Sequence, residues 1–503
     1  MKRIFIFLFA LCTLSSLAQD RIMVIADPHV LPQTVIGQEA DFDAYMAKQR
    51  KMVDLSEPIW HALEDTAMKY RPSLILIPGD LTRDGEQAAH DTVSATLQRL
   101  QQAGIRTLVI PGNHDLAGTN WETLYPGTFE NAVKDPKTKS FAVTPLQGLT
   151  VIGIDGSNGT AGTGQLSSAT LSFILAQADS ARAKGHTIIA MSHWQILEHF
   201  DQQGTLESSC RFKNADALRD SLMHHGVHVV LTGHFHVNGI TTFRDTTGLT
   251  TDSLVEITTG SPITYPCPYR WLTLSEDRAD ISIETEYITS VDTISDLLTY
   301  SREWMKEHTA NMIPTLALKV WNKVDSKWDT DVVPALQAMG FSSITIYAIK
   351  KLLPQTDEER IDMTQRHLGQ PAIDLYIFHS EANENERPAL GDSLANNVYT
   401  GMNNMIDEIF GGIEVSVLFG ALAERMAQEP VQSIVEDRTC RTSIYADQTN
   451  DLQGTLHVNA PQYPEAIEQI ETHSSAQKII QNGQLFIRRG DQIYNANGIR
   501  IVQ

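Results

Sequence analysis

The stretch TLVIPGNHD, residues 107–115, joins an apolar run directly to a cluster of polar side chains. A short run rich in Val, Ile and Leu that ends at Pro and Gly is typical of a buried strand. Asn113, His114 and Asp115 follow at once, and all three can bind a metal ion or handle a proton. Open α/β sheets build their sites just beyond the carboxyl ends of strands. The stretch therefore predicts a functional site at the edge of a sheet.

Four more apolar runs end in the same way. Each is short, rich in Ile or Val, and followed within three residues by Asp or His. They are residues 21–26 before Asp27-Pro28-His29, 74–78 before Gly79-Asp80, 187–192 before His193, and 228–232 before Gly233-His234-Phe235-His236. Gly79, Gly112 and Gly233 each precede a polar cluster, and we expect them to let the backbone turn sharply at the strand end. Five such clusters in order predict one shared site.

Helical spacing appears between these strands, which favours a layered α/β domain. The predicted helices are Asp54–Tyr70, Gln87–Ala103 and Ala169–Lys184. Short strands are expected after His236, at Ile240–Thr242, Leu254–Thr258, Arg270–Leu274 and Ala279–Tyr287.

The polar clusters supply a mixed set of metal ligands. The candidates are Asp27, His29, Asp80, Asn113, His193, His234 and His236. Carboxylate and amide oxygens mixed with imidazole nitrogens suit Mn, Zn or Fe better than Ca or a thiolate site. Seven ligands are too many for one ion and suit two ions about 3.5–4 Å apart, which can hold a phosphoryl group between them. Asp80 stands alone at its strand end and is the natural bridging carboxylate.

The ordered motifs Asp-x-His, Gly-Asp, Gly-Asn-His-Asp, a lone strand-end His and Gly-His-x-His resemble those of the calcineurin-like metallophosphoesterase superfamily. The resemblance covers roughly residues 21–287. It implies a four-layer fold, with two mixed sheets flanked by helices. It also implies one divalent metal ion held by Asp27, His29 and His236, and a second held by Asn113, His193 and His234, with Asp80 bridging. It further implies that His114 is the general acid or transition-state stabiliser, oriented by Asp115.

These roles predict an enzyme that hydrolyses phosphoester bonds. Two metal ions lower the pKa of a bridging water and so provide a hydroxide near neutral pH. His114 can supply a proton or a positive charge to the leaving oxygen. Monoester and diester substrates both stay open, the alternative enzyme being a phosphodiesterase for cyclic nucleotides or other small molecules. An alternative of another class is a non-catalytic surface-binding protein that keeps metals for structure, but such a protein need not retain His114 and Asp115.

The residues that follow Asp80 indicate which branch of the superfamily this chain resembles. Purple acid phosphatases carry an iron-binding Tyr three residues after the corresponding Asp, whereas this chain has Arg83. A ferric–tyrosinate centre is therefore not expected. Residues 79–85, GDLTRDG, are more similar to the cyclic-nucleotide phosphodiesterase branch.

The ends of the chain predict export. Residues 1–18 have a basic Lys2-Arg3, an apolar stretch and the small-x-small pattern Ser16-Leu17-Ala18, which is typical of a signal peptide. We expect the protein in the periplasm, on the cell surface or outside the cell. Residues 478–503 alternate apolar residues across Gly turns and resemble sorting tails of the type IX secretion system, which would make that machinery a partner. The alternative is a small β-appendage docked on the helical domain.

Length and charge limit the remaining possibilities. With 503 residues the chain is too long for one ordinary domain, and a net charge of −22 gives no basic patch for gripping nucleic acid. No stretch is long and apolar enough for a transmembrane segment. We therefore assign residues 19–289 to the metallophosphoesterase domain, 290–477 to a mainly helical domain, and 478–503 to a small β module.

The sequence leaves the roles of two further groups of residues undecided. Residues 379–386, HSEANENE, contain metal-capable side chains, but a solvated acidic loop is the simpler interpretation. Cys210 and Cys267 fall in the same predicted domain and could form a disulfide, which sequence alone does not decide.

Overall fold

A computed structural model gives the structure of part of the chain. It describes residues 19–36, 38, 40–115, 120–157, 162–200, 203, 208–244, 253–338, 340–409, 451–458, 477–481, 484–489, 492–495 and 500–501. The predicted signal peptide, Cys440 and residues 413–426, whose spacing in the sequence predicts a helix, lie outside the described residues. The chain divides into two units, Met1–Ala460 and Pro461–Gln503.

Two mixed sheets form the centre of the first unit. The first sheet has the order β13 (Gln453–His457), β12 (Asp280–Tyr287), β11 (Pro268–Leu274), β1 (Arg21–Val24), β2 (Leu74–Pro78) and β3 (Arg106–Ile110). The second has the order β4 (Val133–Lys134), β5 (Phe141–Leu146), β6 (Leu149–Ile154), β7 (Thr187–Ser192), β8 (Val229–Thr232), β10 (Ser253–Thr258) and β9 (Gly239–Arg244). Strands β1–β3 are parallel, as are β6, β7, β8 and β10, and their neighbours are antiparallel.

The strands bury both of their faces, which explains their nearly continuous apolar runs. In β1, Ile22 and Val24 belong to the core between the two sheets, whereas Met23 packs with α3 (Ser56–Tyr70) and α4 (Gln87–Gln102). In β7, Ile189 joins the core between the sheets, while its neighbours pack against the helices α7 (Ser168–Ala183) and α9 (Ala215–His224).

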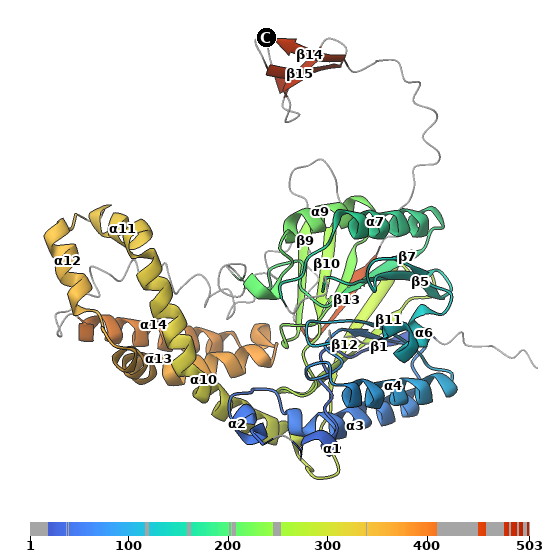
Figure 1. Ribbon diagram of the computed structural model, residues 1–503, viewed down its shortest axis with the longest axis horizontal. Helices are drawn as coiled ribbons and strands as arrows, with labels where there is room; N and C mark the ends of the chain where they lie inside the picture. Colours follow the sequence, from blue (N-terminus) through green and yellow to red (C-terminus); the bar gives the residue numbers. More distant parts are fainter. Residues whose placement is uncertain are drawn as a thin grey trace, which may run out of the picture. The chain divides into compact units, whose positions relative to one another are not determined.

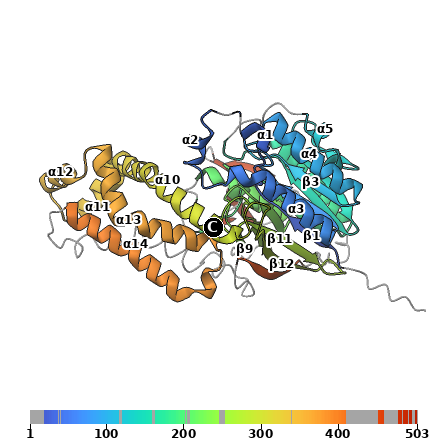
Figure 2. The same ribbon diagram turned by 90° about the horizontal axis from the view of Figure 1, so that it is seen from below.

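Figure 1 shows the resulting layers, with α3 and α4 on one side of the sheets and α7 and α9 on the opposite side. Figure 2 shows α3 and α4 lying side by side along the sheet that contains β1 and β3. The predicted four-layer α/β fold is therefore confirmed.

Shorter helices fill the loops of this domain. They are α1 (Gln33–Ile36), α2 (Phe42–Met46), η1 (Val53–Leu55), α5 (Trp121–Leu124), α6 (Pro126–Phe129) and η2 (Ser208–Cys210). Cys210 and Cys267 are not joined to each other, so the disulfide that the sequence left open between them does not form.

A helical region follows β12. It comprises α10 (Leu297–Lys327), η3 (Trp328–Val332), α11 (Val333–Ala338), α12 (Ser343–Leu352), α13 (Asp357–Ser380), η4 (Glu384–Glu386) and α14 (Pro388–Ile409). Helical spacing predicts separate helices before and after residue 310, but the structure has one helix, α10, that continues through Pro314. None of the described helices combines the length and the apolarity needed to cross a bilayer.

The chain returns to the first sheet after this region, because β13 pairs antiparallel with β12. The second unit contains an antiparallel sheet of β14 (Gln477–Gln481), β15 (Gln484–Arg489), β16 (Gln492–Asn495) and β17 (Arg500–Ile501). This is the small β module expected at the end of the chain. Its role as a sorting tail stays a prediction, as do the predicted domain boundaries.

Candidate metal centre

The carboxyl ends of five parallel strands bring all seven predicted ligands together. Asp27 and His29 follow β1, Asp80 follows β2, and Asn113 follows β3 in the first sheet. His193 follows β7, and the pair at 234 and 236 follows β8 in the second sheet. The site therefore lies at the edge where the parallel strands of both sheets have their carboxyl ends.

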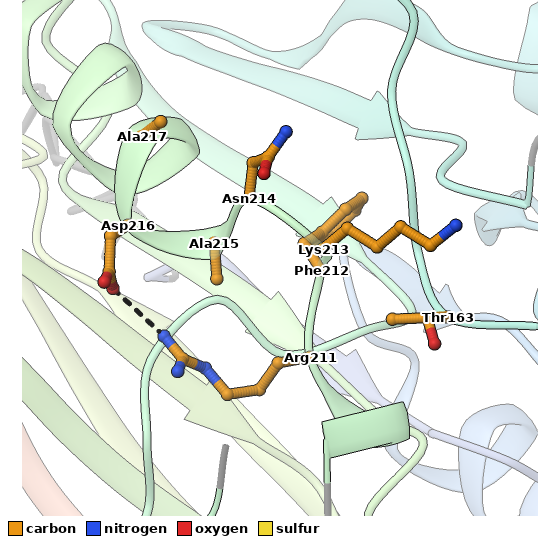
Figure 3. Close-up of a pocket in the computed structure, with 8 residues that line it drawn as sticks. All are labelled: Thr163, Arg211, Phe212, Lys213, Asn214, Ala215, Asp216 and Ala217. Atoms are coloured by element: carbon orange, nitrogen blue, oxygen red, sulfur yellow. Dashed lines mark hydrogen bonds and ion pairs between the residues drawn. The ribbon is translucent and has the colours of Figure 1, made fainter. Parts of the chain in front are cut away.

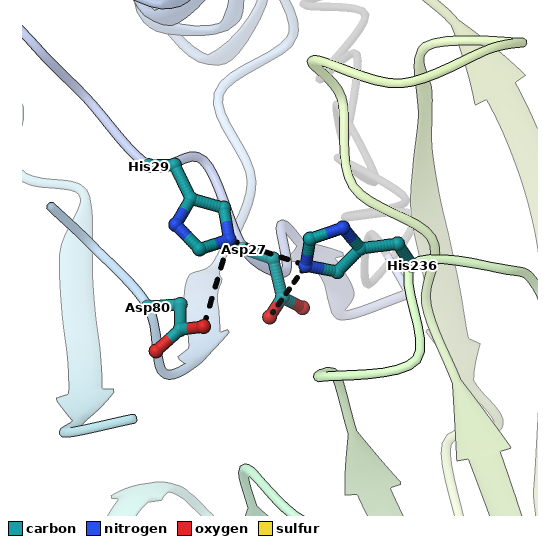
Figure 4. Close-up of side chains that lie close together, drawn as sticks. All are labelled: Asp27, His29, Asp80 and His236. Atoms are coloured by element: carbon teal, nitrogen blue, oxygen red, sulfur yellow. Dashed lines mark hydrogen bonds and ion pairs between the residues drawn. The ribbon is translucent and has the colours of Figure 1, made fainter. Parts of the chain in front are cut away.

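Four of these side chains form a first group around His29. Ligand atoms of Asp27, His29, Asp80 and His236 lie within 4.8 Å of one another. His29 Nε2 is 3.1 Å from His236 Nε2 and 3.5 Å from Asp80 Oδ2. His236 Nε2 is also 3.5 Å from Asp27 Oδ1. Figure 4 shows the two imidazoles and the two carboxylates converging on one point.

Asp80 also belongs to a second group, with His193 and His234. Asp80 Oδ2 is 3.3 Å from His193 Nε2, and His234 Nδ1 is 2.9 Å from the same nitrogen. Asn113 Oδ1 lies 3.0 Å from His193 Nε2 and adds an amide oxygen to this group. One carboxylate is thus shared by two groups of ligands.

The protonation states of these groups fit metal ions. Burial is the main cause that lowers the pKa of His29, His234 and His236, so these rings are neutral and offer lone pairs. Burial opposes ionisation of Asp80, but His193 holds the pKa of this carboxyl well below its usual value.

Nearby carboxylates raise the pKa of the remaining imidazole, that of His193. Burial opposes protonation of His193, yet Asp80 and Asp27 outweigh it and raise the pKa of His193 to about 9. The carboxylates thus favour a positive charge at this position. Hard oxygens mixed with neutral imidazoles form a donor set that suits divalent transition metals. The two groups could hold two metal ions.

The ligand residues have an uncommon backbone conformation. The φ angles are positive at Asp27 (52°), His29 (41°), Asp80 (50°), His234 (66°) and His236 (62°). Positive φ is uncommon for residues with a Cβ and is strained, so the surrounding packing must hold it in place. Hydrogen bonds do part of this, because His29 N donates to Asp80 O at 3.0 Å and His234 N donates to Asp27 Oδ1 at 2.9 Å.

Two of the three glycines of the motifs have a different role from the expected one. Only Gly79 has a positive φ, of 95°. A Cβ on Gly79 would lie 2.6 Å from His193 Nδ1, a Cβ on Gly112 would collide with the Asp80 carboxylate, and a Cβ on Gly233 would collide with Asp27. Gly112 and Gly233 therefore leave room for a ligand that follows another strand, β2 for Gly112 and β1 of the other sheet for Gly233. The sharp-turn explanation holds for Gly79 alone.

His114 lies beside the first group but has another partner than the resemblance implied. Its ring stands edge-on to the His29 ring, with 4.7 Å between the centroids. Its Nδ1 lies 2.7 Å from Asp84 Oδ1, an ion pair if the ring is protonated. Burial lowers the pKa of His114, but Asp84 and Asp80 raise it more, so the protonated ring is favoured.

Asp115 makes different contacts. Its carboxylate accepts hydrogen bonds from the amides of Leu81, Thr82 and Gly112 and from Thr82 Oγ1. Asp115 thus fixes the backbone after β2 and β3, and Asp84 takes the orienting position instead. Asp84 lies in the quoted run GDLTRDG, but nothing in that run indicates which of its polar side chains reaches His114.

A surface pocket of about 600 Å³ lies apart from these ligands. Its lining residues are Thr163, Arg211, Phe212, Lys213, Asn214, Ala215, Asp216 and Ala217. Figure 3 shows Arg211 turned toward Asp216, with 3.2 Å between the charged groups. None of the seven predicted ligands lines it.

The loop at 379–386 is not a solvated acidic loop. His379 Nδ1 lies 2.9 Å from Glu384 Oε1, and Glu384 is 2% exposed. The His379 ring packs 5.8 Å from Phe235, which lies between two of the ligands. Sequence analysis missed this burial because it depends on contacts between distant segments. In the described residues, this pair is not part of a group of three metal-capable side chains.

The family model described as Calcineurin-like phosphoesterase matches residues 20–238. No match to the chain was found among curated protein sequences.

Two solved structures are similar. One is a dimetal phosphatase from Danio rerio, with 16% identity, a TM-score of 0.42, and coverage of 53% of this chain and 95% of that chain. The other is phosphopantetheinyl hydrolase from Mycobacterium tuberculosis, with 14% identity, a TM-score of 0.25, and coverage of 49% and 91%. The segment that matches the calcineurin-like phosphoesterase family, residues 20–238, contains every predicted metal ligand from Asp27 to His236.

Proposed function

We propose that the chain is a metal-dependent hydrolase of small phosphoesters. The observation that carries this proposal is the sharing of Asp80 by two convergent groups of ligands. Asp27, His29 and His236 would hold one ion, and Asn113, His193 and His234 the other. When bound, the two ions supply positive charge for the phosphoryl oxygens and lower the pKa of an attacking water.

His114 is the residue that assists the leaving group in this proposal. Asp84 holds Nδ1 of the ring, which leaves Nε2 as the atom that can donate a proton to the leaving oxygen. The raised pKa of His114 keeps that proton on the ring at higher pH than in a free imidazole. Its edge-on contact with His29 places the ring next to the first group of ligands.

The test uses Asp80→Ala and His114→Ala in the full chain loaded with Mn, Zn or Fe. Asp80→Ala should lose both metal ions and turnover, because it removes the shared ligand. His114→Ala should keep two metal ions while kcat falls by about 10²–10⁴, the usual contribution of a general acid. Metal content is measured by mass spectrometry, and turnover with p-nitrophenyl phosphate and bis-p-nitrophenyl phosphate.

His61→Ala is the matched control, because the His61 side chain is 49% exposed and lies outside both groups. It should change neither metal content nor turnover. Intact turnover in Asp80→Ala or His114→Ala would refute the assigned site. Two metals per chain without hydrolysis of any phosphoester would favour the non-catalytic binding protein.

We also propose that the protein is exported. The basic and apolar pattern of residues 1–18 supports a signal peptide, and the β module of residues 477–501 supports a sorting tail. The mature protein should begin at Gln19, and removal of residues 478–503 should keep it from crossing the outer membrane. Terminal sequencing of the protein from cell fractions measures both. A chain that stays in the cytoplasm with Met1 in place would contradict export.

A further inference from the structure

The loop of residues 260–267, between β10 and β11, holds two residues of the first group by their backbone carbonyls. Ser261 Oγ donates to Asp27 O at 2.7 Å, and Thr264 Oγ1 donates to His236 O at 3.5 Å. Ser261 and Thr264 are both buried, and Thr264 Oγ1 also donates to Ser261 O at 3.0 Å. The two hydroxyls are therefore fixed relative to each other.

The two carbonyls belong to residues with a strained backbone. Asp27 and His236 both have a positive φ, which persists only where the surroundings hold it. The loop approaches them closely, since a Cβ on Gly260 would lie 3.2 Å from His236 O. Partners outside the ligand set orient metal ligands and tune their affinity. The loop thus orients two ligands that belong to the first group alone.

The second group is supported from other elements. His193 Nδ1 lies 3.0 Å from Pro78 O at the end of β2. The link of His234 to the loop is indirect, because its amide donates to Asp27 Oδ1 at 2.9 Å. A change in the loop should therefore act on the first group more than on the second.

Tyr265 joins the same loop to the helical region. Its hydroxyl donates to Glu381 Oε1 at 2.6 Å, and its side chain packs with Met305 of α10 and Ile377 of α13. Burial and the contact with Glu381 raise the pKa of Tyr265, so the hydroxyl keeps its proton and acts as the donor.

Glu381 is fixed in turn by two arginines. Arg387, which precedes α14, bonds Glu381 Oε2, and Arg302 Nε of α10 lies 3.8 Å from Glu381 Oε1. Hydrogen bonds to a charged acceptor are about twice as strong as neutral ones. Tyr265 is therefore anchored to a carboxylate that the helices hold in place.

We propose that Tyr265 is a positioning residue through which the helical region strengthens metal binding by the first group but not by the second. This inference rests on the proposed function, in which the two groups hold two ions. Loss of the Tyr265 hydrogen bond would loosen the loop and its hold on Asp27 and His236. Because the proposed proton donor, His114, lies outside these contacts, the effect should fall on metal affinity and not on kcat.

The test measures Mn²⁺ binding by calorimetry in two variants of the full chain. Asn113→Ala keeps the first group intact, and His29→Ala keeps the second. Adding Tyr265→Phe should weaken Mn²⁺ binding about tenfold in Asn113→Ala and less than about threefold in His29→Ala. Tyr347→Phe is the matched control, because it removes the hydroxyl of a 65% exposed side chain on α12 and should change neither affinity.

Two outcomes would overturn the proposal. One is Mn²⁺ binding that Tyr265→Phe leaves unchanged in Asn113→Ala. The other is an equal loss in both variants, which would show a general loosening of the fold. Urea denaturation of the metal-free chains measures such loosening directly. Ser261→Ala removes the bond to Asp27 O itself and should weaken Mn²⁺ binding in Asn113→Ala at least as much as Tyr265→Phe does.

Kinetics provide a second measurement. With Mn²⁺ in excess, Tyr265→Phe should keep kcat for p-nitrophenyl phosphate within about twofold, while half-maximal turnover should need about tenfold more Mn²⁺. A large fall in kcat at saturating Mn²⁺ would contradict the positioning role.

Failure of this inference can be told from failure of the proposed function. A chain that shows the difference between the two variants but hydrolyses no phosphoester would refute the proposed function and support the role of Tyr265. Phosphoester hydrolysis with equal effects in both variants would do the reverse.

Discussion

Two buried Glu–His pairs adjoin the aromatic pair formed by Phe200 and Phe235, whose ring centroids are 6.1 Å apart. His199 directly precedes Phe200 in the chain, and the His379 ring lies 6.4 Å from Phe200 and 5.8 Å from Phe235. On the sheet side, His199 Nε2 is 3.0 Å from Glu256 Oε1. On the helical side, His379 Nδ1 is 2.9 Å from Glu384 Oε1. The two pairs have the same chemistry and nearly the same length.

Their surroundings differ. Glu256 lies in β10 and also accepts hydrogen bonds from the amides of Ile196 and Leu197, at 2.7 and 2.9 Å. It therefore fixes the backbone that leaves His193. Glu384 lies in the short η4 helix and connects the helical region to Phe235 through the His379 ring. The sheet-side pair therefore helps to position a ligand, whereas the helical-side pair contacts only the aromatic side chain between two ligands.

The largest effect should come from the sheet side, at Gly112. Gly112→Ala would push a methyl group into the Asp80 carboxylate. Because Asp80 belongs to both groups, we expect fewer than two metals per chain. A ligand displacement of about 1 Å typically costs 10²-fold, so kcat/KM should fall at least about 100-fold. Metal content and phosphoester turnover measure the change.

Gly454→Ala is the control for this substitution, because a Cβ on Gly454 meets nothing within 4 Å. It should leave metal content and turnover as they are. Full metal content in Gly112→Ala would show that the site tolerates movement of Asp80.

A smaller effect is expected at Glu256, still on the sheet side. Glu256→Gln replaces a buried carboxylate by a neutral amide that cannot accept all the same hydrogen bonds. The free energy of unfolding should fall by about 2–3 kcal/mol, the value of charge-assisted hydrogen bonds. Turnover should fall about tenfold, because the loop after His193 loosens. Urea denaturation and kcat/KM measure the two quantities. Unchanged turnover would show that the loop after His193 does not position the ligands.

The smallest effect is expected on the helical side, at Glu384. Glu384→Gln should lower the free energy of unfolding by about 1 kcal/mol and change turnover by less than about threefold. The same two measurements apply. If Glu384→Gln reduced turnover as much as Glu256→Gln, the helical region would be part of the catalytic machinery. The contrast between the two Glu–His pairs would then be wrong.

The sheets and the ligands could be predicted from the sequence because the signal for both lies in short, continuous stretches of the chain. Each ligand follows directly on a run whose length and composition indicate a buried strand, as at 107–115, so strand order alone brings the ligands to one edge. The roles of Gly112 and Gly233 were not predictable in this way, because they depend on side chains that follow other strands, in one case a strand of the other sheet.

The helical region was predicted less well. Helix α13 was missed although Thr356 and Glu359 form a capping box at its start, a signal that the sequence contains. The burial of Glu384 and the reach of Asp84 to His114 depend on distant contacts. The spacing of residues in the sequence does not reveal contacts between distant segments.

The strained turns at the ligands bear on when the metals enter. Neighbouring hydrogen bonds hold the positive φ angles, so the backbone itself directs the donor atoms toward one another. Such preorganisation means that loading an ion needs little rearrangement of the chain. If the protein is exported as proposed, it can fold first and take its ions afterwards from the surroundings. The supply of metal outside the cytoplasm, more than the folding pathway, would then decide which pair of ions it carries.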